Sequence, residues 1–205
     1  YYMSGMLITI EGIDGAGQSS VINEVRNSTE LTQQSPEVYF TSEPKSGTWL
    51  GDDVVRKAIN GKHKDLSPVS IFFLFLAEHA SHVDSYIQPQ LEQGKTVICD
   101  RYVDSRYVYQ GYELEQSISG NTLSWIKSIQ EQGWSRMPDL TILLDVSVQT
   151  ALTRLTGDEI FEREDKLREY RKRYQALARE EERYVIVDAE QDLESVIQDC
   201  FEYIL

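Results

Sequence analysis

The sequence has few cysteines and no long apolar run, and each shortage excludes a class of protein. Only two of the 205 residues are cysteines, Cys99 and Cys200, and they lie far apart in the sequence. We therefore expect two buried thiols in a reducing compartment, the cytoplasm, and no disulfide framework. No apolar stretch approaches the roughly 18 residues that cross a bilayer, so we expect no membrane partner.

Basic charge is also scarce. The chain has 20 Lys and Arg against 34 Asp and Glu, a formal net charge of -14. Proteins that bind nucleic acid normally carry a basic surface, so no nucleic-acid partner is expected. Residues 1–5 are too short for a signal peptide. We interpret them as a disordered lead-in or a cloning remnant before Met6, and assign residues 6–205 to a single domain.

Five short apolar runs alternate with helix-like stretches. The strands are expected at LITIE (7–11), VYFTSE (38–43), TVICD (96–100), LTILLDV (140–146) and YVIVDA (184–189). Helices are expected from Gln18, near 50–60, over 68–93, from Ser105, and over 121–132, 148–155, 165–182 and 192–204. Strands that are apolar on both faces suit a parallel sheet covered on both sides, so the fold class is three-layer α/β.

Polar clusters follow the strands, and the first of them is EGIDGAGQSS at residues 11–20. From Gly12 to Ser19 it fits the phosphate-loop pattern G-x-x-x-x-G-K-[ST], except that Gln18 stands at the lysine position. Its backbone amides and the following helix favour phosphate, and Ser19 is placed to ligate Mg²⁺. The predicted ATP-binding residues are Gly12, Ile13, Asp14, Gly15, Ala16, Gly17, Gln18, Ser19 and Ser20. The alternative is a glycine-rich turn without a ligand.

Gln18 can donate hydrogen bonds but cannot neutralise charge. A unit charge about 4 Å from a phosphate charge contributes roughly 4 kcal/mol at an effective dielectric constant near 20. Losing half of that in the transition state would slow the reaction roughly thirtyfold. The sequence therefore predicts either a compensating cation or a slow enzyme.

A second motif is more specific. DRYVDSRYVYQG (100–111) matches D-R-Y-x-x-S-x-x-A-Y-Q-G, with Val108 in place of alanine. SEPKSGTWLG (42–51), LFLAEHASHV (74–83) and PDLTILLDV (138–146) are similar to further motifs of the same family. Together they resemble the thymidylate kinases. The resemblance implies a P-loop NTPase fold with a five-stranded parallel sheet and a short lid, phosphoryl transfer from ATP to dTMP with Mg²⁺, and a homodimer.

The resemblance also implies roles for individual residues. The catalytic residues include Arg101, which is expected to stabilise the transferring phosphate, and Gln18, which is expected to hold the donor phosphates together with the loop amides. Ser19 and Asp100 are expected to hold Mg²⁺. Tyr109 is expected to lie against the deoxyribose and Phe75 to stack on the thymine ring. The acceptor-site residues are Asp14, Glu43, Pro44, Phe75, His79, Arg101, Ser105, Arg106, Tyr109 and Gln110.

The chain departs from the family pattern at several positions. Ser42 and His79 stand where the family often has arginine, and Arg106 stands where relatives have a small or polar residue. Arg106 could supply charge to the acceptor phosphate or lie on the surface. His79 and His82 share a helix face, but no further ligand is near, so no metal site is expected there.

The lid is expected at about 154–165. Some family members keep a catalytic arginine in the phosphate loop and others in the lid. Because this loop has Gly15 at that position, a lid arginine, Arg154 or Arg163, is the more consistent catalytic residue.

Two other functions stay open. The altered acceptor positions suit a related nucleotide kinase with a different monophosphate or deoxynucleoside acceptor. Gln18 suits a catalytically silent regulatory protein that binds nucleotide without turnover.

Overall fold

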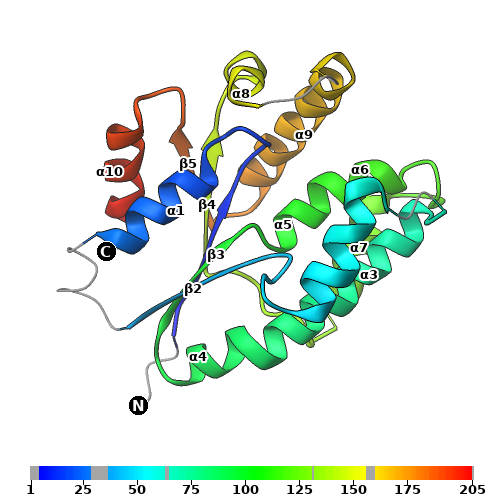
Figure 1. Cartoon of the computed structure of the whole chain (residues 1–205), viewed down its shortest axis with the longest axis horizontal. Coiled ribbons are helices and arrows are strands. Elements are labelled where there is room, and N and C mark those ends of the chain that lie inside the picture. Colours follow the sequence, from blue (N-terminus) through cyan, green and yellow to red (C-terminus); the bar gives the residue numbers. More distant parts are fainter. Residues whose placement is uncertain (1–4, 29–36, 63–64, 131, 156–159, 205) are drawn as a thin grey trace.

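The computed structural model describes residues 5–28, 37–62, 65–130, 132–155 and 160–204. Its centre is a sheet of five parallel strands in the order β2-β3-β1-β4-β5. The strands are β1 (Leu7–Glu11), β2 (Val38–Ser42), β3 (Thr96–Asp100), β4 (Leu140–Asp145) and β5 (Tyr184–Asp188). The predicted fold class is confirmed, and all five strands lie where the apolar runs placed them (Figure 1).

The order of the strands positions the site. β1 lies between β3 and β4, with Ile10 opposite Asp100 on one side and Ile142 on the other. The chain leaves β1 for a helix that leads to β2, and leaves β3 for a helix that leads to β4. The carboxyl ends of β1 and β3 therefore form a point where crossovers diverge, which is where open α/β sheets bind ligands.

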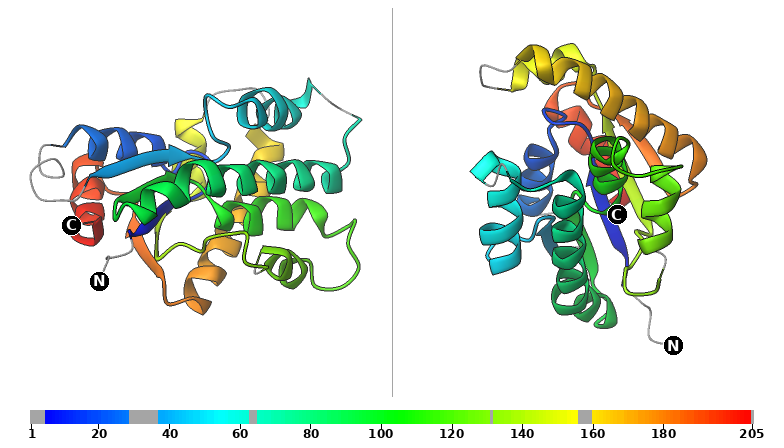
Figure 2. Two further views of the ribbon diagram at one scale, coloured as in Figure 1. Left: turned by 90° about the horizontal axis from the view of Figure 1, so that it is seen from below. Right: turned by 90° about the vertical axis from the view of Figure 1, so that its right-hand side faces the viewer.

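Helices cover both faces of the sheet. In Figure 1, α1 (Gln18–Asn27) and α10 (Leu193–Ile204) lie together on one side. The other face carries α3 (Pro68–His82), α4 (Gln88–Glu92), α5 (Val103–Ser105), α7 (Thr122–Gln130) and α9 (Ile160–Glu180). Two short helices, α6 (Gly111–Leu114) and α8 (Val148–Arg154), follow at the end where the strands finish. In the right-hand view of Figure 2, α9 runs along the top of the molecule.

Two expected helices are interrupted by wider π-type turns. The segment expected near 50–60 consists of η1 (Trp49–Val55) and η2 (Ala58–Lys62). The long helix expected over 68–93 contains η3 (Val83–Ile87) between α3 and α4. Pro89 in the first turn of α4 has no N–H to donate backwards, which accounts for the widened turn before it. A further π-type turn, η4 (Arg106–Gln110), continues α5.

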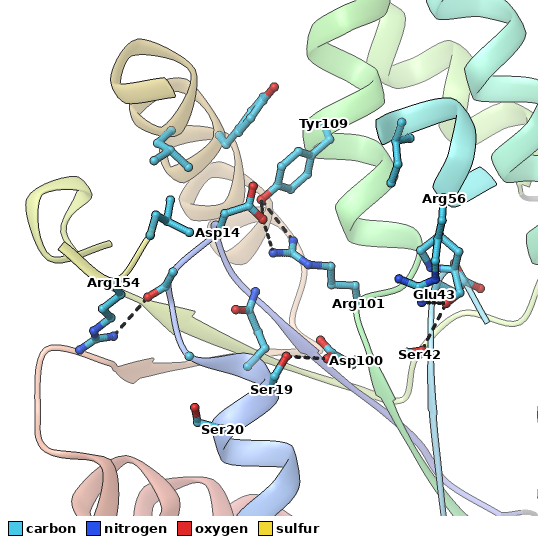
Figure 3. A pocket seen from close by; sticks show the side chains of 18 of the residues that line it. Asp14, Ser19, Ser20, Ser42, Glu43, Arg56, Asp100, Arg101, Tyr109 and Arg154 are labelled. Carbon is cyan, nitrogen blue, oxygen red and sulfur yellow. Dashed lines mark hydrogen bonds and ion pairs between the residues drawn. The ribbon is translucent and has the colours of Figure 1, made fainter. Parts of the chain in front are cut away.

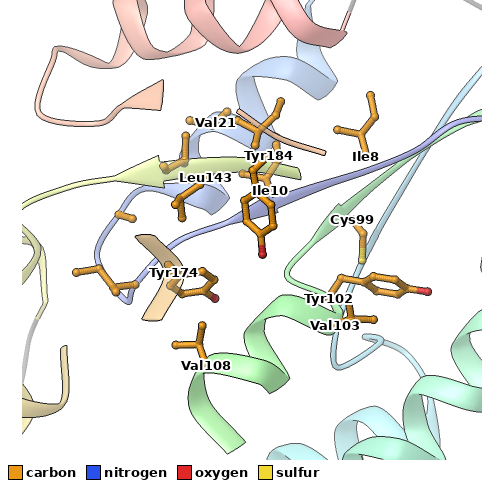
Figure 4. Close-up of a cluster of buried hydrophobic side chains, with 14 of the residues drawn as sticks. Ile8, Ile10, Val21, Cys99, Tyr102, Val103, Val108, Leu143, Tyr174 and Tyr184 are labelled. Carbon is orange, nitrogen blue, oxygen red and sulfur yellow. The ribbon is translucent and has the colours of Figure 1, made fainter. Parts of the chain in front are cut away.

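One apolar core joins the sheet to both helical layers. Ile8, Ile10 and Leu143 from the strands pack with Val21 of α1 and Tyr174 of α9 (Figure 4). Both cysteines are buried and free, as expected. None of the helices in the described ranges is both long and apolar enough to cross a bilayer.

The expected lead-in at 1–5 falls largely outside the described residues. Its last residue, Gly5, departs from that expectation, because it is buried and its N–H donates to the carbonyl oxygen of Leu91 over 2.9 Å. A Cβ at this position would lie 2.1 Å from the carbonyl oxygen of Lys95, so the close approach requires glycine.

Candidate active site

A cleft of about 1180 Å³ opens at the carboxyl ends of the strands (Figure 3). It receives residues from the loop after β1, the segment after β2, the end of β3, and helices α8 and α9. The loop residues that line it are Asp14, Gly15, Gly17, Gln18, Ser19 and Ser20. Of the remaining predicted loop residues, Ile13 and Ala16 turn their side chains into the core. The cleft thus brings together segments that lie far apart in the sequence.

The loop conformation depends on glycine at two positions. Gly15 has φ 85°, and a Cβ there would lie 2.5 Å from the carbonyl oxygen of Ala151. Gly17 has φ 101° and caps the N-terminus of α1. A larger residue at position 15 would meet the backbone of α8, so this loop has no room for an arginine there.

Gln18 is buried, at 5% exposure, although it lines the cleft. Its Nε2 donates to the carbonyl oxygen of Gly12 over 2.8 Å. The amide therefore closes the loop on itself, and the side chain brings no charge to the site.

Arg101 stands opposite the loop with its guanidinium group in the cleft. Nη1 donates to the Gly12 carbonyl oxygen at 3.0 Å and to the Tyr109 hydroxyl at 3.2 Å, and Nη2 donates to Asp14 Oδ1 at 2.8 Å. Its φ of 60° is the only positive value of a non-glycine residue in the described part of the chain. A backbone held in this region is a recurrent feature of functional sites.

The predicted metal ligands also meet here. The Ser19 hydroxyl donates to Asp100 Oδ2 over 3.4 Å, and both residues line the cleft. Burial raises the pKa of the Asp100 carboxyl, against the effect of neighbouring Arg101. A hydroxyl and a carboxylate beside a phosphate loop fit Mg²⁺, which binds hard oxygen ligands and keeps several waters or phosphate oxygens. The described residues contain no cluster of three or more His, Cys, Asp or Glu that could hold a metal.

A smaller pocket of about 260 Å³ adjoins the cleft. The residues that line both are Asp14, Glu43, Pro44, Ile59, Arg101 and Tyr109. All but one of the predicted acceptor-site residues line this pocket. They are Asp14, Glu43, Pro44, Phe75, Arg101, Ser105, Arg106, Tyr109 and Gln110. Arg101 and Tyr109 lie on the boundary between the two cavities, since both residues line both.

His79 is the exception, because it lies behind this pocket. It is fully buried, and its Nδ1 lies 2.5 Å from Glu43 Oε1 and its Nε2 lies 2.8 Å from the Ser135 hydroxyl. Burial, followed by the charge of Arg106, lowers the pKa of His79 to about 4, so the imidazole is neutral at neutral pH. A neutral ring that contacts Glu43 supports the pocket wall without lining the pocket.

The surface alternative for Arg106 is wrong. The side chain is 2% exposed, and its Nη1 donates to Glu43 Oε2 over 2.5 Å. Gln130, with its amide oriented to satisfy its neighbours, accepts from Nη2 and Nε of Arg106 at 2.8 and 3.1 Å. Although burial acts to raise the pKa of Glu43, the hydrogen bond from His79 and the charge of Arg106 hold it well below its ordinary value. The result is a buried ion pair at the base of the acceptor pocket.

Several residues that line the cleft were not singled out from the sequence, among them Arg56, Lys166 and Tyr170. Arg56 donates through Nη2 to the Pro44 carbonyl oxygen at 2.6 Å, and its Nε contacts Asp52 Oδ1 at 3.1 Å. The available signal was the Asp52–Arg56 spacing of four residues after the SEPKSGTWLG motif. Lys166 and Tyr170 enter from α9. Their pattern within a charged helix does not distinguish them from solvated residues.

Of the two arginines predicted for the lid, the structure describes the side chain of one, Arg154. Arg154 lies across the loop from Arg101 (Figure 3), with Nη1 3.3 Å from the Gly15 carbonyl oxygen and Nη2 3.2 Å from that of Ala189. Arg163 belongs to α9, but its side chain lies outside the described part, as do residues 156–159 of the expected lid.

Comparison with known proteins identifies the family of this chain. The chain matches the thymidylate kinase family profile over residues 10–200. It is 41% identical over 210 residues to a probable thymidylate kinase of Methanosarcina acetivorans, covering 98% of each chain. Similar proteins of the same description come from Methanococcoides burtonii, at 38% identity over 98% of this chain and 97% of the relative, and from Halobacterium salinarum, at 36% over 95% and 93%. The chain belongs to the thymidylate kinase family.

Proposed function

We propose that the protein transfers the γ-phosphoryl group of ATP to dTMP, giving ADP and dTDP. The observation that carries this proposal is the pair of adjoining cavities that share Arg101. One is lined by the phosphate loop and the other by the predicted acceptor residues. A donor in the first and an acceptor in the second would meet at the guanidinium group.

The proposed mechanism is in-line transfer, in which the protein supplies position and positive charge. The amides of the loop at 12–20 hold the donor phosphates. Arg101 stabilises the charge on the transferring group, and Arg56 faces the same cleft near Pro44, where the acceptor phosphate would enter. The acceptor phosphate is already an anion, so no strong general base is required.

Ser19 and Asp100 are the residues that would hold Mg²⁺, whose charge would neutralise part of the charge of the donor phosphates. Arg154 contacts the loop carbonyls on the side away from Arg101. It is the described lid arginine that could compensate for the missing lysine. Arg163 remains the second candidate by family resemblance.

The acceptor pocket supports a pyrimidine monophosphate. Phe75 offers a ring face for stacking, and Tyr109 is placed beside Arg101, where it would border the sugar. Arg106 brings guanidinium donors to the acceptor pocket, where it pairs with Glu43. Phe75, Tyr102 and Gln110, which line the same pocket, are uncharged. Guanidinium donors favour the carbonyl groups of thymine over the amino group of cytosine.

A catalytically silent nucleotide-binding protein is the second candidate, and Gln18 is the observation that favours it, since its amide is engaged with Gly12. A homodimer is a further proposal. It rests on family resemblance and on Phe73 of α3, an apolar residue that is 51% exposed. A cytoplasmic location remains a prediction from the free thiols.

The test is ADP release with ATP and Mg²⁺, measured with dTMP, dUMP, dCMP and thymidine in turn and without acceptor. We expect turnover that depends on dTMP and is weakest with dCMP. ATP binding without acceptor-dependent turnover would favour the silent protein. Preference for another acceptor would overturn the assignment of the pocket.

A further inference from the structure

Glu11 is a fully buried carboxylate that the mechanism above does not use. It is the last residue of β1 and directly precedes Gly12. Its Oε1 accepts from the Tyr102 N–H at 2.7 Å, and its Oε2 accepts from the hydroxyls of Ser105 at 2.7 Å and Tyr174 at 2.8 Å. One carboxylate thus joins the loop strand to the segment after β3 and to α9.

The bond to Tyr102 has a consequence for its neighbour. The Tyr102 N–H belongs to the peptide group that follows Arg101, the residue with φ 60°. On the other side, the Arg101 N–H donates to the Ile10 carbonyl oxygen at 3.1 Å. The left-handed turn is therefore held on both flanks by the end of β1. A conformation that side chains disfavour persists only when its surroundings fix it.

The Ser105 hydroxyl, which contacts Glu11, also contacts the Arg101 side chain. Ser105 lies 2.9 Å from the Tyr174 hydroxyl and accepts from Arg101 Nη1 at 3.4 Å. Two hydrogen-bonded routes therefore link Glu11 to Arg101. One runs through the Tyr102 N–H to the Arg101 backbone, and the other runs through the Ser105 hydroxyl to the Arg101 side chain.

We propose that Glu11 is a positioning residue that holds the strained turn at Arg101, and so aims the guanidinium group at the transferring phosphate. This role rests on the proposed phosphoryl transfer. It is exerted through hydrogen bonds to the neighbours of Arg101, since the described contacts give no direct bond between the two side chains.

Glutamine is the conservative replacement for this site. Burial and the charge of Asp104 raise the pKa of Glu11 to about 7, so the protonated form is abundant at pH 6. In Glu11→Gln the amide oxygen can accept from Tyr102, and the NH₂ group can donate to the two hydroxyls, which also accept. Glu11→Leu has a similar size but leaves the Tyr102 N–H without an acceptor.

Thr9→Val is the matched control. Thr9 lies two residues earlier on β1, is fully buried, and shares a hydrogen bond of 3.0 Å with Thr141. Removing its hydroxyl also breaks a buried polar contact of the same strand. The hydrogen bond of its hydroxyl leads to Thr141 on β4, on the side of β1 away from the Arg101 turn.

The experiment measures kcat and KM for ATP at pH 6 in the wild type and the three variants, together with hydrogen exchange of the Tyr102 amide. We expect Glu11→Leu to lower kcat about a hundredfold with little change in KM, as expected for a small misplacement of a catalytic group. Exchange at Tyr102 should accelerate at least tenfold in the same variant. Glu11→Gln and Thr9→Val should stay within about threefold of the wild type in kcat, the range we allow for a retained geometry.

Three results would overturn the inference: unchanged kcat and exchange in Glu11→Leu, an equal loss in Glu11→Gln, or an equal loss in Thr9→Val. If the wild type shows no turnover with dTMP, the proposed function fails. The exchange of the Tyr102 amide, which needs no substrate, then still decides whether Glu11 holds the turn.

Discussion

The side-chain amide of Gln18 and the guanidinium group of Arg101 donate to one and the same acceptor, the carbonyl oxygen of Gly12, at 2.8 and 3.0 Å. The residue at the usual lysine position therefore fixes the shape of the loop from inside. A lysine at this position would both shape the loop and bring a positive charge, whereas Gln18 only shapes the loop.

This difference predicts the effect of Gln18→Lys. The lysine should raise kcat about thirtyfold, because half of a 4 kcal/mol phosphate interaction corresponds to that factor in rate. Gln18→Met, which has neither the charge nor the donor, is the control for the hydrogen bond to Gly12. Steady-state kinetics at saturating ATP and dTMP make the comparison. Equal rates in wild type and Gln18→Lys would show that another cation already supplies the missing charge.

Gly15→Ala should damage the loop more than its backbone conformation alone explains. Its φ of 85° costs about 1–2 kcal/mol for any L side chain. The new Cβ would also lie 2.5 Å from the Ala151 carbonyl oxygen, so the loop or α8 must shift. We expect a lower Tm and a KM for ATP raised about tenfold, since the phosphate cradle is displaced.

Gly120→Ala is the control for that change. Gly120 has φ 90° but nothing within 4 Å of the added Cβ. It should lose stability from the backbone cost alone and keep the KM for ATP. If both variants showed the same change in KM, the contact with Ala151 would not matter.

His79→Gln should change the pH dependence of the free energy of unfolding. The pKa of His79 is about 4 in the folded protein against an ordinary 6.5, so the unfolded chain binds the proton more readily between these values. The stability linked to a neutral His79 is present above pH 6.5 and is lost as the pH falls towards 4. The advantage of the wild type over the variant should shrink by up to about 1.4 kcal/mol per pH unit in this window. Urea unfolding at several pH values measures it.

Glu78→Gln should reveal a pH dependence of stability that is opposite in sign to that of His79→Gln. Glu78 is 1% exposed, its Oε1 accepts from the Lys45 N–H, and its Oε2 has no hydrogen-bond partner among the residues that the structure describes. Burial and the charge of Glu43 raise its pKa from 4.5 to about 7. The folded protein then binds the proton more tightly, so this contribution is full below pH 4.5 and is lost as the pH rises through 7. In the same urea series, a wild-type advantage over Glu78→Gln that grows with pH would contradict this assignment.

Much of this architecture could be predicted because local patterns carry it. Each strand is a short apolar run bounded by polar residues, and all five were found. The phosphate loop and the DRYVDSR segment follow strands, so their meeting at one edge followed from the parallel arrangement.

The contacts across elements could not be predicted in this way. Arg106 pairs with Glu43 across 63 positions of sequence, and no local pattern indicates whether an arginine turns inwards. Arg56 likewise enters the cleft only because η1 folds back over Pro44. The widened turn at Val83–Ile87 depends on Pro89, which was present in the sequence but was not used as a break in the long helix.

The strand order also has a consequence for how the chain is made. β1 and β2 are consecutive in the sequence, but β3 separates them in the sheet, and β1 also needs β4 on its other side. A ribosome therefore releases two apolar strands that have no native partner until residues 96–100 have emerged, and the central strand is complete only after residues 140–145. The pairing of β1 with both of its neighbours must therefore wait for the second half of the chain, and until then its unpaired edge is exposed to aggregation.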